Sequence, residues 1–430
     1  MKRPWSVFVR SMIVFVVLHA LLSSFACDGG DDASSSEATQ DDDTDDDDSA
    51  DALDDDTTLD DDVDDDALDD DTVDVIPARC PFAPEPSDAV GVFVAKTGDD
   101  ANPGTMAAPM LTVAAAVVKP RRAEGPSSSP KVCDEEEIAV GRDVRGLFGG
   151  YEAETWLRDL DLRKTVVKST VSNGTSVEGG DYPDVAYLEG LEFVGRETEG
   201  DEAFDYADAL SVERGSVIIS CCRSTGGHAT HRTTGVDASS TTLLVLNSIL
   251  EGGVVSEFGS ATGLEAHQSS TLVVNSVVVG GLPGSSGSSH AIESDDPYSF
   301  VVLSSYLHGG WSDGPPNSSR AVGIGNVKFY TVATLANNVI DGGRAGDSKA
   351  IVTTHAALIL THNDIWEPDG DCLVWDLTWA PICYRTIKQL EWLPDVFVAW
   401  GNLQCRSDVP GLLRRRLPLG GRKPLPRYRG

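Results

Sequence analysis

Short apolar stretches recur between residues 209 and 366, each interrupted by polar residues at a similar spacing. The two clearest copies read GVDASSTTLLVLNSILEGG (235–253) and GLEAHQSSTLVVNSVVVGG (263–281). Each copy contains an alternating strand, a polar break, a second apolar strand, a small polar residue and Gly-Gly. Because alternation of this kind is typical of β-strands, the pattern predicts a repeat protein built from short strands.

The repeat length indicates a solenoid. Propeller blades need about 40–50 residues, whereas two or three short strands in each repeat fit one turn of a parallel β-helix. Stacked turns, about 4.8 Å apart, bury a continuous core that one turn cannot bury alone. Aligning the second strands places six residues in one column, at intervals of 26, 28, 29, 33 and 25 positions: Cys221, Asn247, Asn275, Ser304, Asn337 and His362. We expect Asn247, Asn275 and Asn337 to form an internal amide ladder.

Two motifs precede the repeats. Residues 90–119 read VGVFVAKTGDDANPGTMAAPMLTVAAAVVK, which predicts a strand over 92–96, a turn, and a short helix with Thr112 as its N-cap. Residues 146–159 read GLFGGYEAETWLRD. Both motifs resemble segments of pectin-lyase-like proteins, in particular surface β-helix lipoproteins of Gram-negative bacteria. The resemblance implies a right-handed parallel β-helix closed at one end by the first motif, and it implies no particular reaction.

We therefore expect residues 77–405 to form an all-β, single-stranded right-handed parallel β-helix. An early coil is expected at 187–193, and residues 386–393 are expected to form a short helix that covers the last coil. Such a cap is needed because an open last coil offers unpaired backbone groups to other chains. Gly-Gly pairs at 252–253, 280–281, 309–310 and 342–343 predict tight turns between coils.

The N-terminus has the composition of a secretory signal over residues 1–26. Basic residues precede an apolar run at 12–22 and the small-residue sequence SSFA. That run is shorter than the about 20 residues that span a bilayer. We expect export, either with a lipid on Cys27 that holds the protein at the outer membrane or cell surface, or as plain secretion. Ser24 stands where lipoprotein signals usually carry leucine.

Charge is distributed unevenly along the chain. Residues 28–75 contain 25 acidic residues and no Lys or Arg, so residues 27–76 are expected to form a disordered spacer. The net charge of −36 disfavours nucleic acid as a partner. The tail 406–430 contains seven Arg and one Lys. It is either the product of a shifted reading frame or a genuine basic tail that folds back on the spacer.

Eight cysteines can be oxidised in an exported protein. They are Cys27, Cys80, Cys133, Cys221, Cys222, Cys372, Cys383 and Cys405. Spacing alone does not fix their connectivity. The pairs that we consider are Cys80 with Cys133 and Cys372 with Cys383, near the two ends of the body. At least one of the adjacent Cys221 and Cys222 is expected in the core.

A second column carries candidate chemistry. Asp237, Glu265 and Glu293 follow apolar residues at intervals of 28 positions, so all three are expected to point outward in one row. Like charges this close need solvent, a cation or a shared proton. Pectate-lyase-like enzymes place calcium ligands and a basic catalytic residue on such a face, so the resemblance implies a calcium or catalytic row here.

Arg232, His267 and His290 are expected near this row. The sequence departs from the enzyme pattern in two respects: no coil contains three acids, and no Arg or Lys falls in the matching column. A merely solvated face is therefore the alternative interpretation. His228 and His231 resemble a metal pair but lack a third ligand.

Aromatic residues could stack on sugars or pack structurally: Tyr298, Tyr306, Trp311, Tyr330 and Trp366. The favoured function is non-enzymatic, by adhesion, glycan contact or envelope structure, in a monomer that requires no cofactor. A calcium-assisted polysaccharide lyase or glycoside hydrolase is the alternative.

Overall fold

The computed structural model describes much of the chain between residues 80 and 402. The omitted stretches in that range are 81, 84, 90, 119–126, 131–137, 161–164, 172, 181–183, 198–204, 257, 312–319, 329–331, 346, 355, 368–371, 378–380, 391–395 and 401. The expected signal, lipidation site, spacer and basic tail all lie outside the described residues. Among the residues that are described, no helix is long and apolar enough to cross a membrane.

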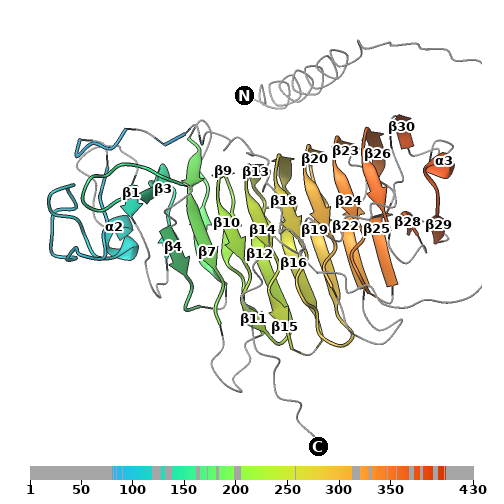
Figure 1. Ribbon diagram of the computed structural model, residues 1–430, viewed down its shortest axis with the longest axis horizontal. Helices are drawn as coiled ribbons and strands as arrows, with labels where there is room; N and C mark the ends of the chain where they lie inside the picture. The colour runs from blue at the N-terminus through green and yellow to red at the C-terminus, as the bar shows by residue number, and fades with distance from the viewer. Residues whose placement is uncertain are drawn as a thin grey trace, which may run out of the picture. The chain divides into compact units, whose positions relative to one another are not determined.

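The body is a right-handed parallel β-helix, as predicted. Its strands stack in three sheets that follow one another along the chain from N- to C-terminal coils (Figure 1). Sheet I contains β2 (Ala139–Val140), β5 (Thr175–Glu178), β8 (Leu210–Glu213), β12 (Arg232–Ser239), β16 (Ser260–His267), β19 (Ser288–Asp295), β22 (Arg320–Lys328), β25 (Asp347–Thr354), β28 (Val374–Asp376) and β29 (Ile382–Tyr384). Sheet II contains β1 (Ser127–Pro130), β3 (Gly146–Tyr151), β6 (Ala186–Glu189), β9 (Ser216–Ser220), β13 (Thr242–Leu246), β17 (Ser270–Val274), β20 (Ser299–Leu303), β23 (Val332–Ala336), β26 (Ala357–Thr361) and β30 (Val396–Trp400).

Sheet III is formed by short strands of three or four residues. It contains β4 (Thr165–Lys168), β7 (Leu191–Val194), β10 (Arg223–Thr225), β14 (Ile249–Glu251), β18 (Val277–Val279), β21 (Tyr306–His308), β24 (Val339–Asp341) and β27 (Asp364–Trp366). Two further strands, β11 (His228–Ala229) and β15 (Val254–Val255), pair with each other between sheets III and I in sequence. One coil therefore runs through sheet I, sheet II and sheet III before the chain rises to the next.

The corners of each coil have a simple chemical basis. Gln268, between β16 and β17, has φ 47°, and Asn275, between β17 and β18, has φ 49°. This left-handed conformation is uncommon for residues other than glycine, although asparagine is enriched in it. The third corner is the Gly-Gly pair, where a Cβ on Gly253 would lie 2.0 Å from the carbonyl oxygen of Gly227. Only glycine fits there, because successive coils touch through their backbones.

The core lies between the three sheets and follows the predicted register. Val236 pairs with Leu264, and Leu264 pairs with Ile292, so equivalent residues stack in successive coils. All three side chains are completely buried. Each such side chain contributes roughly 1.5–3 kcal/mol through burial. Stacking of like residues is what makes the sequence periodic.

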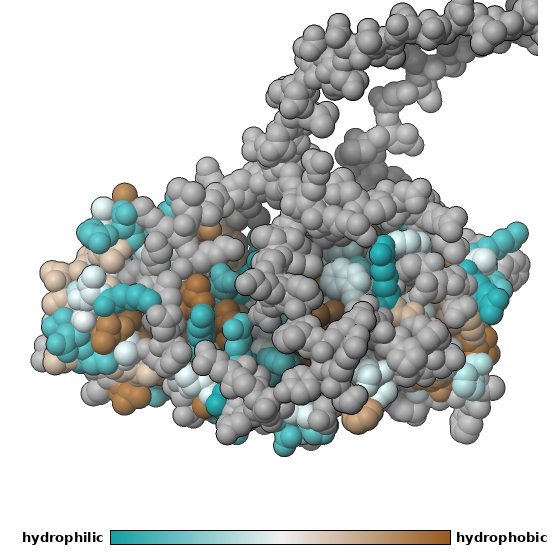
Figure 2. All heavy atoms as spheres, turned by 60° about the horizontal axis from the view of Figure 1, so that its bottom comes forward, coloured by the Kyte–Doolittle hydropathy of each residue, from teal (hydrophilic) through white to brown (hydrophobic). Residues whose placement is uncertain are grey.

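Several large apolar side chains of the described residues are exposed. They include Leu157, Phe258 and Tyr298, which come from different coils. Where Figure 2 shows described residues on its side of the molecule, hydrophobic ones lie interspersed with hydrophilic ones.

The internal ladder lies one residue downstream of the predicted one. Asn247, Asn275 and Asn337 occupy the left-handed corner, and Asn275 and Asn337 are exposed. One bond joins Asn275 Nδ2 to Asn247 Oδ1 over 2.7 Å, but Ser304 interrupts the column. The corner conformation directs the column outward and turns the following residue inward, which the strand pattern alone did not reveal.

The residues that turn inward are Ser248, Ser276, Ser305, Asn338 and Asn363, with Asn402 at the C-terminal end. They are buried except Asn402 and bond from coil to coil. Asn338 Nδ2 donates to Asn363 Oδ1 over 3.0 Å, and the Ser305 backbone N–H donates to Asn338 Oδ1 over 2.9 Å. This column satisfies backbone groups that the corner would otherwise leave unpaired.

Replacing Asn338 by Ala is expected to lower the free energy of unfolding by about 1–3 kcal/mol, because buried partners lose their hydrogen bonds. Urea unfolding followed by circular dichroism measures this loss. The neighbouring change Asn337→Gly is the control and should stay within about 0.5 kcal/mol, because glycine suits the left-handed corner. Equal losses at both positions would contradict the assignment of the ladder.

The N-terminal segment closes the first coil. Thr112 caps α2 (Val113–Val118), with its Oγ1 accepting from the Ala115 N–H over 3.1 Å, as predicted. The expected strand over 92–96 is reduced to isolated bridge positions at Phe93 and Val94, of which Val94 pairs with Met110. The second motif packs beneath this segment through Trp156, whose ring meets Phe93 edge-on at 4.6 Å.

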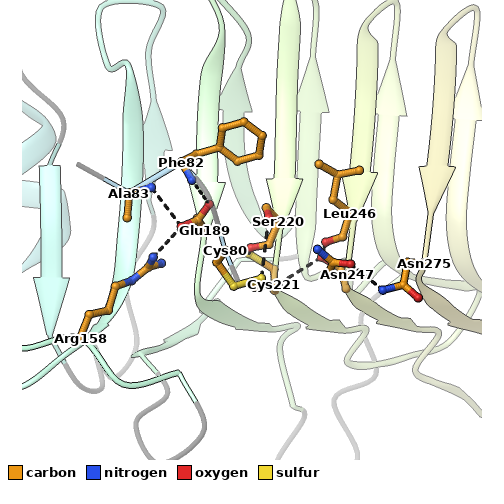
Figure 3. Close-up of a disulfide and its surroundings, with 12 residues drawn as sticks. Cys80, Phe82, Ala83, Arg158, Glu189, Ser220, Cys221, Leu246, Asn247 and Asn275 are labelled. Carbon is orange, nitrogen blue, oxygen red and sulfur yellow. Dashed lines mark hydrogen bonds and ion pairs between the residues drawn. A yellow bond between two sulfur atoms is a disulfide. The ribbon is translucent and has the colours of Figure 1, made fainter. Parts of the chain in front are cut away.

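A strap at the start of the described chain crosses two coils (Figure 3). Cys80 forms a disulfide with Cys221, with their Cα atoms 6.0 Å apart. The predicted pair of Cys80 with Cys133 is therefore wrong, and Cys133 lies outside the described residues. Cys221 is available because it occupies an outward corner, whereas Cys222 is free and buried in the core, as expected for one of the two.

Glu189 fixes the strap one coil earlier. Its buried carboxylate accepts the backbone N–H groups of Phe82 and Ala83 over 3.0 and 3.1 Å. The same carboxylate pairs with Arg158 Nη1 over 2.5 Å. The strap, the second motif and sheet II therefore meet at a single ionised group (Figure 3).

The C-terminal coil is closed by a short helix at the expected place, and residues 391–393 of the expected range lie outside the described residues. Within the range 386–393, α3 covers Ile387–Leu390, and Leu390 is completely buried. Thr386 and Gln389 form a reciprocal capping pair, which explains where the helix begins. The predicted disulfide between Cys372 and Cys383 is confirmed and joins the segment before β28 to antiparallel β29.

Candidate functional site

The predicted acidic row lies on the outer face of sheet I. Asp237 of β12 pairs in register with Glu265 of β16, and Glu265 pairs with Glu293 of β19. The register prediction is therefore confirmed. The three side chains are not freely solvated, since Glu265 is buried and the other two are half-buried. Carboxylates at this depth need partners.

Arg232 reaches the row because its strand changes direction. In a regular strand, residues 232 and 237 would lie on opposite faces, about 17 Å apart. The pairing of β12 with β16 skips Gly235, whose Cβ, if present, would lie 2.6 Å from the carbonyl oxygen of Gly263. The irregularity at this glycine brings Arg232 and Asp237 to the same side.

Arg232 is the hub of the site. Its Nη2 lies 3.0 Å from Asp208 Oδ2 and 2.8 Å from Asp237 Oδ2, and its Nη1 lies 3.3 Å from Glu265 Oε1. The Tyr206 ring lies against the other side, with its centroid 5.2 Å from the guanidinium carbon. Arg232, which was expected near the row, therefore contacts two of its carboxylates although it does not belong to the column itself.

His267 adds a second basic group beside Glu265. Its Nε2 lies 2.7 Å from Glu265 Oε1, and its Nδ1 lies 3.8 Å from Asp295 Oδ2. The hydrogen bond to Glu265 raises the pKa of His267, against the opposing effect of burial. Glu265 thus contacts a guanidinium and an imidazole at once.

His290 and Glu293 form a separate pair at the next coil. His290 Nδ1 lies 3.0 Å from Glu293 Oε2, although the angle does not make a hydrogen bond. The imidazole lies beside Gly325, the residue that pairs with Glu293 in the following coil. A Cβ at Gly325 would lie 3.1 Å from the ring, so glycine provides room for it there.

Burial governs the protonation of the remaining acids. It raises the pKa of Asp208 to about 6, against the lowering effect of Arg232. It also raises the pKa of Asp237. Burial alone would lower the pKa of Arg232, but the carboxylates of Asp208, Glu265 and Asp237 outweigh it and raise that pKa. The site therefore contains one carboxyl group, that of Asp208, that can exchange a proton near neutral pH.

Asp208 and Tyr206 are the members that the sequence reasoning missed. Asp208 lies just before β8, and its side chain is 2% exposed. The repeat interval could have placed Asp208 next to β12. Asp208 lies 26 positions before Thr234, and the same interval separates Cys221 from Asn247. Both were overlooked because the strand pattern is weakest at the N-terminal edge of sheet I.

The other predicted site residues do not assemble into metal sites. His231 Nδ1 lies 3.2 Å from Asp205 Oδ1, and both side chains are more than half exposed. His228 lies on β11. Within the described ranges, no three His, Cys, Asp or Glu side chains are placed to hold one metal ion.

Three of the predicted aromatic residues lie on or beside sheet III. Tyr306 and Trp311 flank His308, with ring centroids 6.3 and 4.4 Å from it, and Trp366 pairs in register with Asp341. Tyr298 is exposed alone, and Tyr330 lies outside the described residues. Tyr306, Trp311 and Trp366 therefore lie on or beside sheet III and away from the acidic row.

His308 is a buried, uncharged histidine. Burial lowers its pKa to about 4, and its Nδ1 accepts the Gly310 N–H over 2.9 Å. Asp341 Oδ2 lies 3.7 Å from Nε2, and burial raises the pKa of Asp341 to about 6. Nothing in the sequence pattern marked this pair.

The stability conferred by His308 should depend on pH. Its folded pKa lies below the unfolded value of about 6.5, so protonation favours the unfolded chain and stability is lost as pH falls from about 6.5 to about 4. The free-energy difference between wild type and His308→Gln should shift against wild type by about 3 kcal/mol over that range. His267→Gln should show the opposite sign, since the folded pKa of His267 is raised. Urea unfolding at pH 7 and pH 4 tests both, and equal slopes would contradict the account.

Comparison with known proteins gives structural neighbours only. No protein-family description matches this sequence, and no curated protein matches it. Among solved structures, the pectate lyase Pel9A has 12% identity and a TM-score of 0.41, covering 68% of this chain and 78% of its own. A rhamnogalacturonan lyase has 9% identity and a TM-score of 0.33, covering 61% and 82%.

The catalytic domain of a GH87 α-1,3-glucanase has 11% identity and a TM-score of 0.28, covering 70% of this chain and 57% of its own. These values assign no activity to the chain. Its architecture rests on its own three parallel sheets and their register. The chain is a right-handed parallel β-helix.

Proposed function

We propose that this protein is an exported, surface-held β-helix protein that binds polysaccharide along the outer face of sheet I. The observation that supports the proposal best is the convergence of Asp208, Asp237 and Glu265 on Arg232. Several coils supply one cluster of hydrogen-bonding groups on one face, and the row continues through Glu293. A sugar chain lying across the coils would meet equivalent positions in succession.

The test is a glycan-array screen of the full chain, with and without calcium. Wild type is compared with Asp237→Asn/Glu265→Gln/Glu293→Gln, which keeps the side-chain shapes and removes the charges. We expect at least tenfold weaker binding in the variant. The control Glu154→Gln/Glu192→Gln/Asp364→Asn changes three acids away from sheet I and should bind as wild type does. Unchanged binding by the row variant would refute the proposal.

A second candidate function is glycoside hydrolysis or lysis at the same row, with calcium as a possible assistant. It is favoured by the pKa of Asp208, which at about 6 allows a protonated carboxyl to serve as general acid near neutral pH. Release of reducing ends by wild type, abolished in Asp208→Asn, would establish a hydrolase, whereas ultraviolet absorbance from an unsaturated product would indicate a lyase.

The surface location rests on the sequence around Cys27. Cys27→Ser is expected to move the protein from the membrane fraction to the soluble fraction. It should also abolish incorporation of an alkyne-labelled fatty acid. Cys222→Ser serves as the control, because that cysteine is buried. A wild-type protein that takes up no label and is found only in the medium would instead be a plainly secreted one.

A further inference from the structure

In the acidic site, the polar atoms without a hydrogen-bond partner are mainly carboxylate oxygens, which accept hydrogen bonds. The Oδ2 atoms of Asp208 and Asp237 both accept hydrogen bonds from Nη2 of Arg232. Their second oxygens are both buried, and no described residue meets hydrogen-bond geometry with them, although the Thr234 side chain is close enough to lower the pKa of Asp208. The Asp208 side chain is 2% exposed, whereas that of Asp237 is 18% exposed and is the one that a ligand can reach. A buried acceptor of this kind calls for a ligand that supplies N–H or O–H groups.

The guanidinium of this cluster, that of Arg232, already forms ion pairs with the acids of the site. Arg232 contacts three carboxylates, and of its nitrogens only buried Nε lacks a partner among the described residues. An incoming sugar carboxylate would therefore displace an existing ion pair and meet the remaining acids at close range. Like charges about 4 Å apart repel by several kcal/mol near a protein surface.

The surrounding face carries the same sign. Beside the acidic row, the outer column of sheet I continues through Glu178, Glu213 and Asp295, with His267 among them. Arg142 and Arg214 pair with Glu178 at the N-terminal end. Among the described side chains around the row, Arg142, Arg214 and Arg232 are therefore held by acids of this face, so a ligand at the row meets a negative field.

We propose that the sheet I site binds a glycan bearing protonated amino groups, of the glucosamine type, and that an ammonium group is held at the partly exposed carboxylate of Asp237, beside Asp208. An ammonium has three donors and no acceptor, so it matches a carboxylate, which only accepts. The ring of Tyr206, which is 45% exposed, offers an aromatic face beside this position for stacking. This inference rests on the proposed glycan-binding function of the same face.

Calorimetric titration of the full chain with three hexasaccharides at about 0.15 M salt tests the inference. They are a glucosamine hexamer, its fully N-acetylated counterpart and a galacturonate hexamer. We expect the glucosamine hexamer to bind at least tenfold more tightly than the acetylated one, and the galacturonate hexamer not to bind. Asp237→Asn should remove most of this preference. Since the acidic segment 28–75 also attracts polycations, Glu154→Gln/Glu192→Gln serves as the matched control and should keep it.

Each outcome decides one of the two claims. Equal binding of the amino and acetylated hexamers, lost in the sheet I row variant, would overturn the amino-group inference and leave the proposed function standing. Preference for galacturonate would overturn the inference as well. If no glycan binds, or if the row variant binds like wild type, the proposed function fails with it. The comparison of the amino and acetylated hexamers uses the wild-type protein. It therefore tests the inference even if Asp237→Asn does not fold.

Discussion

Glu189→Gln is expected to lower the free energy of unfolding by about 3–5 kcal/mol, the largest effect of a single side chain in the N-terminal half. Glu189 is completely buried, pairs with Arg158, and accepts the backbone N–H groups of Phe82 and Ala83. Gln has the same shape but carries no charge. Its amide N–H₂ group is a donor, and it would occupy a position where a carboxylate oxygen now accepts a hydrogen bond. Arg158 would be left with an uncompensated charge at a largely buried position.

Urea unfolding of the oxidised chain measures this effect. Glu192→Gln is the matched control, because it makes the same substitution three residues later on the outer side of β7. The control should change stability by no more than about 0.5 kcal/mol. If both variants lose the same amount, the buried ion pair does not hold the strap to the second coil.

Arg232→Met is expected to destabilise the fold by about 3–5 kcal/mol near neutral pH, because three carboxylates lose the charge that compensates them. The loss should shrink as pH falls. Asp208 has a folded pKa of about 6, above its unfolded value of about 3.9, so its ionisation favours the unfolded chain as pH rises through that window. Without Arg232, this unfavourable ionisation becomes larger.

Thermal and urea unfolding at pH 4 and pH 7.5 test this prediction. Arg223→Met is the control, because Arg223 also pairs with a carboxylate, that of Glu251, on sheet III. Its side chain is 28% exposed and serves one partner only, so a loss of about 1 kcal/mol or less is expected. A loss from Arg232→Met that is small, or that does not depend on pH, would show that the cluster is solvated rather than charge-coupled.

The sequence was informative where the structure repeats. The interval of 28 positions correctly placed Val236 beneath Leu264 and Asp237 beside Glu265, because pairing in a parallel stack preserves the period. The same reasoning failed at the corners. Asn275 adopts a left-handed conformation, and this shifts the inward position to Ser276, whose burial the alternation of a strand does not predict.

The site was only partly predictable for a related reason. The irregularity at Gly235 reverses the alternation, so Arg232 joins the face of Asp237, from which strict strand alternation would exclude it. Contacts between distant parts of the chain have no periodic signal at all. The disulfide between Cys80 and Cys221 spans 141 positions and links the strap to a corner, whereas the 11-position pair Cys372 and Cys383 could be found from local spacing.

The central claim is that a glycan lies on the outer face of sheet I, and a crystal structure of the full chain with a bound hexasaccharide tests it most directly. The account predicts sugar density across β12, β16 and β19, with polar contacts to Asp237, Glu265 and Glu293. Sugar bound instead on sheet II or beside the aromatic residues of sheet III, with the acidic row untouched, would contradict it.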